Sequence, residues 1–215
     1  DETILQDVNI DIPAGKLTTI IGQSGSGKTT ILDMIAGLTS PTNGEVRVDG
    51  VPLQTVDLKD WRRQIGYAPQ DTVLLHDTIY HNVTLGDPDL DEEDARHALL
   101  QADAWDFVAA LPGGMQTSVG ERGARMSAGQ RQRIMLARAL AHRPRLLILD
   151  EATSALDPAS EAAICKTLKG LCGDLTIVAV SHQPALAEFA HVVYTVSERT
   201  VHRPPPGSQA HRAAV

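Results

Sequence analysis

The chain has 215 residues, of which 42% are hydrophobic and 3% aromatic. This length suits one large α/β domain, or a core with an inserted subdomain, whose interior must be built from Leu, Ile, Val and Ala. The formal net charge of −8, from 27 acidic and 19 basic residues, argues against a nucleic-acid partner, because such partners are bound through a basic surface. No apolar run approaches the ~20 residues that span a bilayer, and the chain starts without Met, so we expect a domain of a longer polypeptide.

The first predicted elements are two strands and a helix. Residues 4–12 alternate apolar and polar side chains, as a half-buried strand does. Residues 17–21 form a short apolar and β-branched run, which predicts a buried strand. Ile31, Leu32 and Ile35 then recur at helical spacing, so a helix should follow this strand after a short loop.

Residues 22–29, between that buried strand and that helix, fit the phosphate-loop pattern G-x-x-x-x-G-K-[ST] at every fixed position. They are Gly22, Gln23, Ser24, Gly25, Ser26, Gly27, Lys28 and Thr29, followed by Thr30. The glycines let backbone N–H groups curl around phosphate oxygens, and the helix aims its positive end at the same anion. Lys28 can reach the β- and γ-phosphates, and the Thr29 hydroxyl can ligate Mg²⁺. The loop therefore predicts a nucleotide site.

The middle of the chain changes character. A short strand is expected over 45–48, a helix capped by Asp57 up to about residue 63, and a strand over 65–68. Buried strand-like runs then vanish up to residue 125. Helical patterns replace them, over 79–85, 91–102 and 104–111. We interpret residues 72–125 as a helical subdomain inserted into an α/β core made of residues 1–71 and 126–202.

The core resumes with a helix over 128–141 and a continuous apolar run over 146–149, typical of a central parallel strand. Asp157 and Pro158 predict the start of another helix, as N-cap and first residue. The remaining expectations are a buried strand over 175–180, an edge strand over 192–196 and a disordered tail over 203–215.

Asp150 and Glu151 follow the apolar run over 146–149 directly. Ligands of open α/β sheets bind at the C-terminal ends of the strands, so both carboxylates are expected at the site. Asp150 can hold Mg²⁺ through its water shell, and Glu151 can accept a proton from the water that attacks the γ-phosphate.

Four further motifs lie along the chain, at residues 70, 126–130, 154–157 and 182. Residues 126–130, Met-Ser-Ala-Gly-Gln, resemble the LSGGQ signature of ATP-binding-cassette (ABC) ATPases. Gln70 matches the Q-loop glutamine of that family, residues 154–157 match its D-loop, and His182 matches its switch histidine. The resemblance extends to about residue 200.

The resemblance implies a phosphate-loop (RecA-like) α/β core with a mainly parallel sheet, an antiparallel β portion at the N-terminus and the inserted helical subdomain. It implies that Lys28, Gln70, Glu151 and His182 are catalytic and that Thr29, Gln70 and Asp150 hold Mg²⁺. The ATP-contacting residues it implies, besides the phosphate loop with Thr30, are Gln70, Ser127, Ala128, Gly129, Gln130, Asp157 and His182. Because the signature closes over the nucleotide of the opposite subunit, the working unit is expected to be a head-to-tail dimer, most simply a homodimer.

Two departures from the family pattern matter. Ala128 stands where the signature usually has its first glycine, and Met126 stands where it has leucine. We expect activity to be retained, since Ser127 and Gly129 are present. The family stacks adenine on an aromatic residue, and residues 1–60 contain none. The adenine platform is therefore expected on a segment that precedes residue 1.

The branch of the family is suggested by residues 117–123, which resemble the X-loop of exporters, where it touches the transmembrane domain. Residues 61–66 and 77–79 are also similar to exporters. We therefore expect an ATPase on the cytoplasmic face of a membrane, fused to or associated with a transmembrane domain. The alternatives are an importer ATPase with separate permeases, a non-transport ABC ATPase, and a nucleotide sensor without turnover. The presence of both Glu151 and His182 disfavours the sensor.

Overall fold

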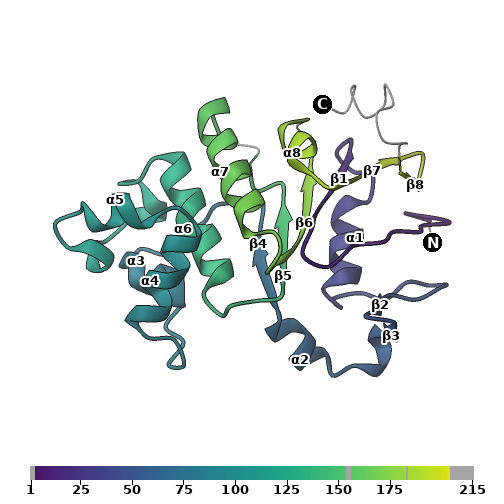
Figure 1. Cartoon of the computed structure of the whole chain (residues 1–215), viewed down its shortest axis with the longest axis horizontal. Coiled ribbons are helices and arrows are strands. Elements are labelled where there is room, and N and C mark those ends of the chain that lie inside the picture. Colours follow the sequence, from purple (N-terminus) through teal and green to yellow (C-terminus); the bar gives the residue numbers. More distant parts are fainter. Residues whose placement is uncertain (1–2, 154–155, 183, 204–215) are drawn as a thin grey trace.

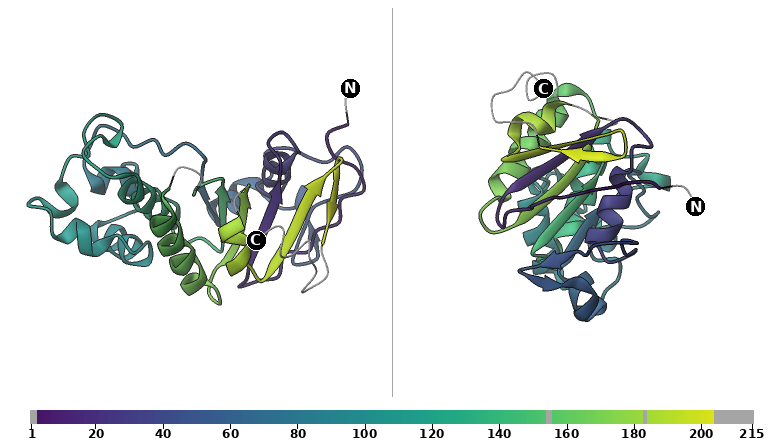
Figure 2. Two further views of the ribbon diagram at one scale, coloured as in Figure 1. Left: turned by 90° about the horizontal axis from the view of Figure 1, so that it is seen from above. Right: turned by 90° about the vertical axis from the view of Figure 1, so that its right-hand side faces the viewer.

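The computed structural model describes residues 3–153, 156–182 and 184–203. An open twisted sheet forms one part of the molecule, and a group of helices projects from it (Figures 1 and 2). The sheet has the strand order β4-β5-β6-β1-β7-β8, and every neighbouring pair is parallel except β7 and β8. Its strands are β1 (Leu17–Gly22), β4 (Ile65–Ala68), β5 (Leu146–Asp150), β6 (Thr176–Ser181), β7 (Val192–Ser197) and β8 (Thr200–His202). A separate antiparallel pair is formed by β2 (Arg47–Val48) and β3 (Val51–Pro52).

The helices follow the predicted capping signals closely. Asp57 accepts hydrogen bonds from the first turn of α2, and Asp157 does the same for α7, where Pro158 is the first residue. The α-helices are α1 (Lys28–Ile35), α2 (Leu58–Arg63), α3 (Ile79–Thr84), α4 (Glu92–Gln101), α5 (Trp105–Ala109), α6 (Ala128–Leu140), α7 (Pro158–Leu171) and α8 (Pro184–Phe189). Three short 3-10 turns are η1 (Leu53–Thr55), η2 (Gly114–Gln116) and η3 (Glu121–Gly123). Within the described part of the chain, no helix has the length and apolar character needed to cross a bilayer.

The predicted fold class, a mainly parallel α/β sheet with an antiparallel portion and helices, is confirmed. The antiparallel portion lies in the β2–β3 and β7–β8 pairs, and the strand expected over 4–12 is wrong. A strand needs a hydrogen-bonded neighbour along its length. Here Gln6 N donates to Arg199 O at 2.8 Å, but Asp7 adopts a φ of 53° and interrupts the extended run.

The expectation that residues 192–196 form an edge strand is also wrong. β7 lies between β1 and β8, and β8 forms the edge of the sheet. The sequence interpretation missed β8 because three residues after a tight turn carry almost no periodic signal. It also missed α8. The tail expected to be disordered lies, from residue 204 on, outside the described residues.

Helices α3 and α4 pack against α6 at the end of the molecule away from β1 (Figure 2, left). Their buried side chains, such as Val83 and Leu99, belong to one hydrophobic cluster together with Ile134 of α6 and Leu147 of β5. Apolar packing therefore runs without interruption from the sheet into the helical part. The division into a core and an inserted subdomain at residues 72 and 125 stays a prediction.

A buried polar network ties α6 to α3 and to the segment before α3. The Arg138 guanidinium donates to Asn82 O at 2.6 Å, to Asn82 Oδ1 at 2.9 Å and to Val73 O at 3.2 Å. Asn82 is fully buried, and its amide also donates to Leu75 O at 3.0 Å and to Thr78 O at 2.9 Å. Burial lowers the pKa of Arg138, and these acceptors compensate for the loss of water around its charge.

Arg138→Leu is expected to lower the free energy of unfolding by about 1.5–3 kcal/mol, because buried acceptors lose charged donors. Urea unfolding followed by circular dichroism measures the change. The matched control is Arg133→Leu on the same helix. Its guanidinium donates to Asp103 O at 2.8 Å and lies 3.3 Å from Asp103 Oδ2 at the surface, so its loss should cost less than about 1 kcal/mol. Equal losses in the two variants would contradict a special role for the buried network.

Candidate active site

The phosphate loop connects β1 to α1 and takes a conformation that side chains would obstruct. Gly27 is the N-cap of α1 in a left-handed conformation, with φ of 100°, and Gly25 has φ of 77°. A Cβ on Gly22 would lie 2.7 Å from Val196 O, which is closer than carbon and oxygen can approach. The Ser26 hydroxyl is buried and has no hydrogen-bond partner among the described residues, so this loop has polar capacity that its own chain does not use.

Lys28 is the first residue of α1, and its side chain folds back under the loop. It is 4% exposed, and its Nζ donates to Gly22 O at 2.9 Å and to Gln23 O at 2.8 Å. The same ammonium lies 3.6 Å from Glu151 Oε1. A buried charge requires such partners, and the ammonium is thus held beneath the glycine loop.

Glu151 is the residue at which the predicted catalytic side chains meet. Its Oε2 accepts a hydrogen bond from Gln70 Nε2 at 3.1 Å and lies 3.3 Å from His182 Nδ1. Gln70 follows β4, Glu151 follows β5, His182 follows β6, and Lys28 follows the loop after β1. Because these neighbouring strands are parallel, their C-terminal ends meet at one edge, where open α/β sheets bind ligands.

The backbone of Glu151 has a φ of 48°, in the left-handed region that a non-glycine residue rarely adopts. Its N–H donates to Val180 O at 3.0 Å, which anchors it to the neighbouring strand. Such a conformation costs on the order of 1–3 kcal/mol and is characteristic of functional sites. The left-handed residue comes directly after Asp150, where β5 ends.

Asp150 is 8% exposed and meets two hydroxyl groups at one carboxylate oxygen. Thr29 Oγ1 donates to Asp150 Oδ2 at 3.5 Å, and the Tyr67 hydroxyl donates to the same oxygen at 3.2 Å. Burial raises the pKa of Asp150, while the Tyr67 hydrogen bond acts in the opposite direction. Burial also raises the pKa of Tyr67, and the charge of Asp150 adds to this effect. A carboxylate beside a threonine hydroxyl is a donor set that fits Mg²⁺, which prefers oxygen ligands.

Sequence reasoning missed Tyr67. Its signal was a tyrosine in a short strand three residues before Gln70, but nothing in the sequence states that β4 pairs with β5. Of the remaining phosphate-loop residues, Gln23 and Ser24 are exposed, and Thr30 is half-buried on α1.

The signature segment forms the start of α6. Ser127 is its N-cap and accepts a hydrogen bond from Gln130 N at 3.2 Å, while Gln130 Oε1 accepts one from Ser127 N at 2.9 Å. Ala128 and Gly129 occupy the first turn, and a Cβ on Gly129 would lie 3.1 Å from Ser160 Oγ at the start of α7. Within the described residues, no hydrogen bond or ion pair joins this segment to the phosphate loop or to Glu151.

Asp157 acts as the N-cap of α7 and accepts hydrogen bonds from Ala159 N and Ser160 N, both at 3.1 Å. The Ser160 hydroxyl also donates to the Asp157 carboxylate at 2.6 Å. This hydrogen bond contributes most to lowering the pKa of Asp157. Ser154 and Ala155, the first two residues of the predicted D-loop, lie outside the described residues.

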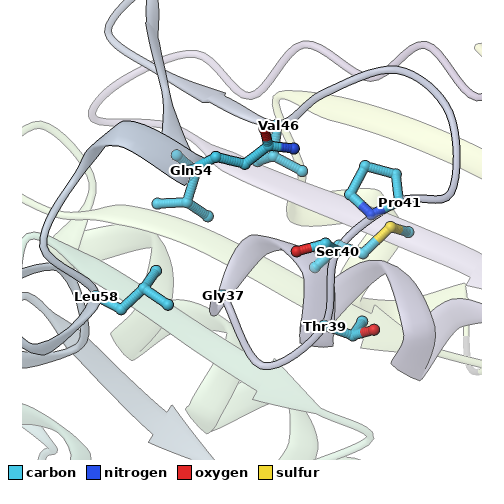
Figure 3. Close-up of a pocket in the computed structure, with 9 residues that line it drawn as sticks. Gly37, Thr39, Ser40, Pro41, Val46, Gln54 and Leu58 are labelled. Atoms are coloured by element: carbon cyan, nitrogen blue, oxygen red, sulfur yellow. The ribbon is translucent and has the colours of Figure 1, made fainter.

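The described residues form two pockets, one near the signature segment and one elsewhere. A pocket of about 280 Å³ lies beside the signature segment, lined by Gln70, Asp71, Thr72, Ala128, Arg131, Gln132 and Leu156. A smaller hollow of about 50 Å³ lies between the end of α1 and the segment from β2 to α2 (Figure 3). Its lining, which includes Gly37, Val46 and Leu58, contains no acidic or basic side chain, so the smaller hollow offers no group for acid–base chemistry.

A protein-family model described as ABC transporter matches residues 5–154 of the chain. The exotoxin translocation ATP-binding protein PaxB of Pasteurella aerogenes is 46% identical over 180 residues, which cover 84% of this chain and 25% of the relative. ABC transporter B family member 24, mitochondrial, of Arabidopsis thaliana is 43% identical over 183 residues, covering 85% of this chain and 27% of the relative. The chain thus spans about a quarter of the length of these curated relatives.

A solved structure described as a bacterial Atm1-family ABC exporter with ATP bound is also similar. It superposes with a TM-score of 0.82 at 32% sequence identity and covers 93% of this chain and 35% of that one. The similarity therefore includes the helical part as well as the sheet.

Proposed function

The chain belongs to the ABC transporter family, and from this premise we propose that it binds and hydrolyses ATP to drive export across a membrane. The observation that carries the proposal is the convergence of Lys28, Gln70 and His182 on the single carboxylate of Glu151. Relatives named for toxin translocation and a similar structure named as an exporter favour export over the importer alternative. In this proposal the cargo would be recognised by a transmembrane domain.

In this proposal the phosphate loop binds the triphosphate through its backbone N–H groups and Lys28. Thr29 and Asp150 would hold Mg²⁺, with Gln70 reaching the same region from the end of β4. When bound, Mg²⁺ neutralises charge on the β- and γ-phosphate oxygens. Lys28 exchanges its contact with Glu151 for the phosphates, because an ammonium prefers the more highly charged partner.

Glu151 then acts as the general base. Its Oε2 is oriented by the Gln70 amide and the His182 imidazole, so the carboxylate is directed by two side chains from the neighbouring strands. His182 would additionally contact the γ-phosphate. The attacking water loses its proton to Glu151 as its oxygen bonds to the γ-phosphorus. The bond between that phosphorus and the β–γ bridging oxygen breaks in the same displacement, and ADP leaves with the bridging oxygen.

We further propose that two copies work head to tail. Ser127 is the N-cap of the 13-residue helix α6, and Gly129 lies in its first turn. The first N–H groups and the positive end of this helix suit the γ-phosphate bound by the opposite copy. Ala128, Gln130 and Asp157 would lie beside that phosphate. The division into an ATP-binding core (1–71 and 126–202) and a helical subdomain (72–125) belongs to the same proposal. The helical subdomain would contact the transmembrane domain on the cytoplasmic face of the membrane.

Dilution tests the shared site. Phosphate release from MgATP per chain is expected to rise with protein concentration and to fall toward zero on dilution, because only the dimer holds complete sites. Activity per chain that stays flat across a thousandfold dilution would contradict the dimer, whereas absence of hydrolysis at any concentration would contradict the enzyme.

Mixing two inactive variants tests which residues are shared. Lys28→Ala damages the phosphate loop, and Ser127→Arg damages the signature. A mixed dimer contains one site with neither lesion, so turnover should reappear on mixing. Each variant mixed with itself is the control.

A further inference from the structure

Tyr67 lies on β4, the strand next to the one that carries Asp150, and its ring packs against a hydrophobic cluster that includes Ile148 and Val178. The ring is half-buried, which fixes the direction of its hydroxyl. That hydroxyl donates to Asp150 Oδ2 at 3.2 Å. The only polar atom of the Tyr67 side chain thus binds the carboxylate that is proposed to hold Mg²⁺.

The same oxygen receives the Thr29 hydroxyl, at the longer distance of 3.5 Å. Two hydroxyls from different elements therefore meet at Oδ2, and no described side chain donates a hydrogen bond to Oδ1. Thr29 is itself a proposed metal ligand and lies on the exposed side of the loop. The Tyr67 ring packs against the hydrophobic cluster, so its hydroxyl is the more firmly positioned of the two that meet Asp150 Oδ2.

We propose that Tyr67 is a positioning residue that holds the Asp150 carboxylate in the orientation required for Mg²⁺ with ATP. This inference rests on the proposed nucleotide function of the site. Groups that orient metal-binding carboxylates from behind are typically worth ~10–100-fold in metal affinity or activity. Tyr67 would act on Mg²⁺ through Asp150 and would not touch the nucleotide.

Tyr67→Phe removes the hydroxyl and keeps the ring. Binding of a fluorescent ATP analogue is measured with EDTA and then over a series of Mg²⁺ concentrations. The affinity in EDTA should stay at the wild-type value, while the Mg²⁺ concentration for half-maximal enhancement rises ~10-fold or more. An unchanged Mg²⁺ dependence would overturn the proposal. This binding measurement needs no turnover. A negative result would therefore refute the role of Tyr67 without affecting wild-type hydrolysis, on which the proposed function depends.

Tyr194→Phe is the matched control. Tyr194 is 3% exposed, and its hydroxyl accepts a hydrogen bond from Asp11 N at 2.8 Å and donates to Asp11 O at 3.0 Å. It loses a comparable buried hydroxyl on the same sheet without touching Asp150. Its Mg²⁺ dependence should match the wild type, and an equal shift in both variants would mean that the effect is general.

A double-mutant cycle identifies the route of the effect. In an Asp150→Asn background, the proposed metal-binding carboxylate is gone, so adding Tyr67→Phe should shift the Mg²⁺ dependence by less than twofold. A further ~10-fold shift in that background would show that Tyr67 acts elsewhere. The melting temperature of each variant is measured in EDTA. The Mg²⁺ titrations are then run below the lowest melting temperature, so that only folded proteins are compared.

Discussion

Replacing Glu151 by Gln is expected to slow ATP turnover by ~10²–10⁴ while ATP binding is retained. The amide has nearly the same shape as the carboxylate, so contacts with Gln70 and His182 remain sterically possible. It cannot accept a proton from water, and the general-base contribution is lost. Steady-state phosphate release and nucleotide titration separate the two effects.

Glu161→Gln is the matched control for this variant. Glu161 is also largely buried and lies on α7, where its Oε1 accepts a hydrogen bond from the Thr153 hydroxyl at 3.4 Å. Among the described residues, no hydrogen bond or ion pair joins it to Lys28 or Gln70. Its replacement should leave turnover within about twofold of wild type. Near-wild-type turnover in Glu151→Gln would remove Glu151 from the mechanism, and equal losses in both variants would point to a folding defect.

Lys28→Ala is expected to weaken ATP binding by ~10–100-fold, since hydrogen bonds that involve a charged group contribute about 1.5–3 kcal/mol each. The substitution also leaves Glu151 without its cationic partner, so the emptied site carries an uncompensated negative charge that repels the triphosphate. Isothermal titration calorimetry with MgATP measures the affinity directly.

Lys59→Ala controls for the loss of one positive charge from a chain that already carries −8. Lys59 is exposed in the first turn of α2, so its removal should change ATP affinity less than twofold. An ATP affinity of Lys28→Ala equal to that of Lys59→Ala would refute a specific phosphate contact.

Local sequence rules accounted for much of the scaffold. The helix that follows the phosphate loop, the caps of α2 and α7 and the buried β5 depend on residues within a few positions of one another. Such features are encoded where they occur, and this is why spacing and residue type predicted them. The expected strand over 4–12 failed for the opposite reason, because a strand requires partners that its own sequence does not supply.

For the candidate site, the sequence determined which residue types are present and the order in which they follow the strands. Glycines, a lysine and paired acids at fixed spacing restrict the chemistry to phosphate binding and proton transfer. The tertiary structure decided which of them touch. Glu151 meets Gln70 and His182 because β5 lies between β4 and β6, and Tyr67 reaches Asp150 for the same reason. Strand order is settled by long-range burial of apolar faces, and this information is spread over the whole chain and is present in no single motif.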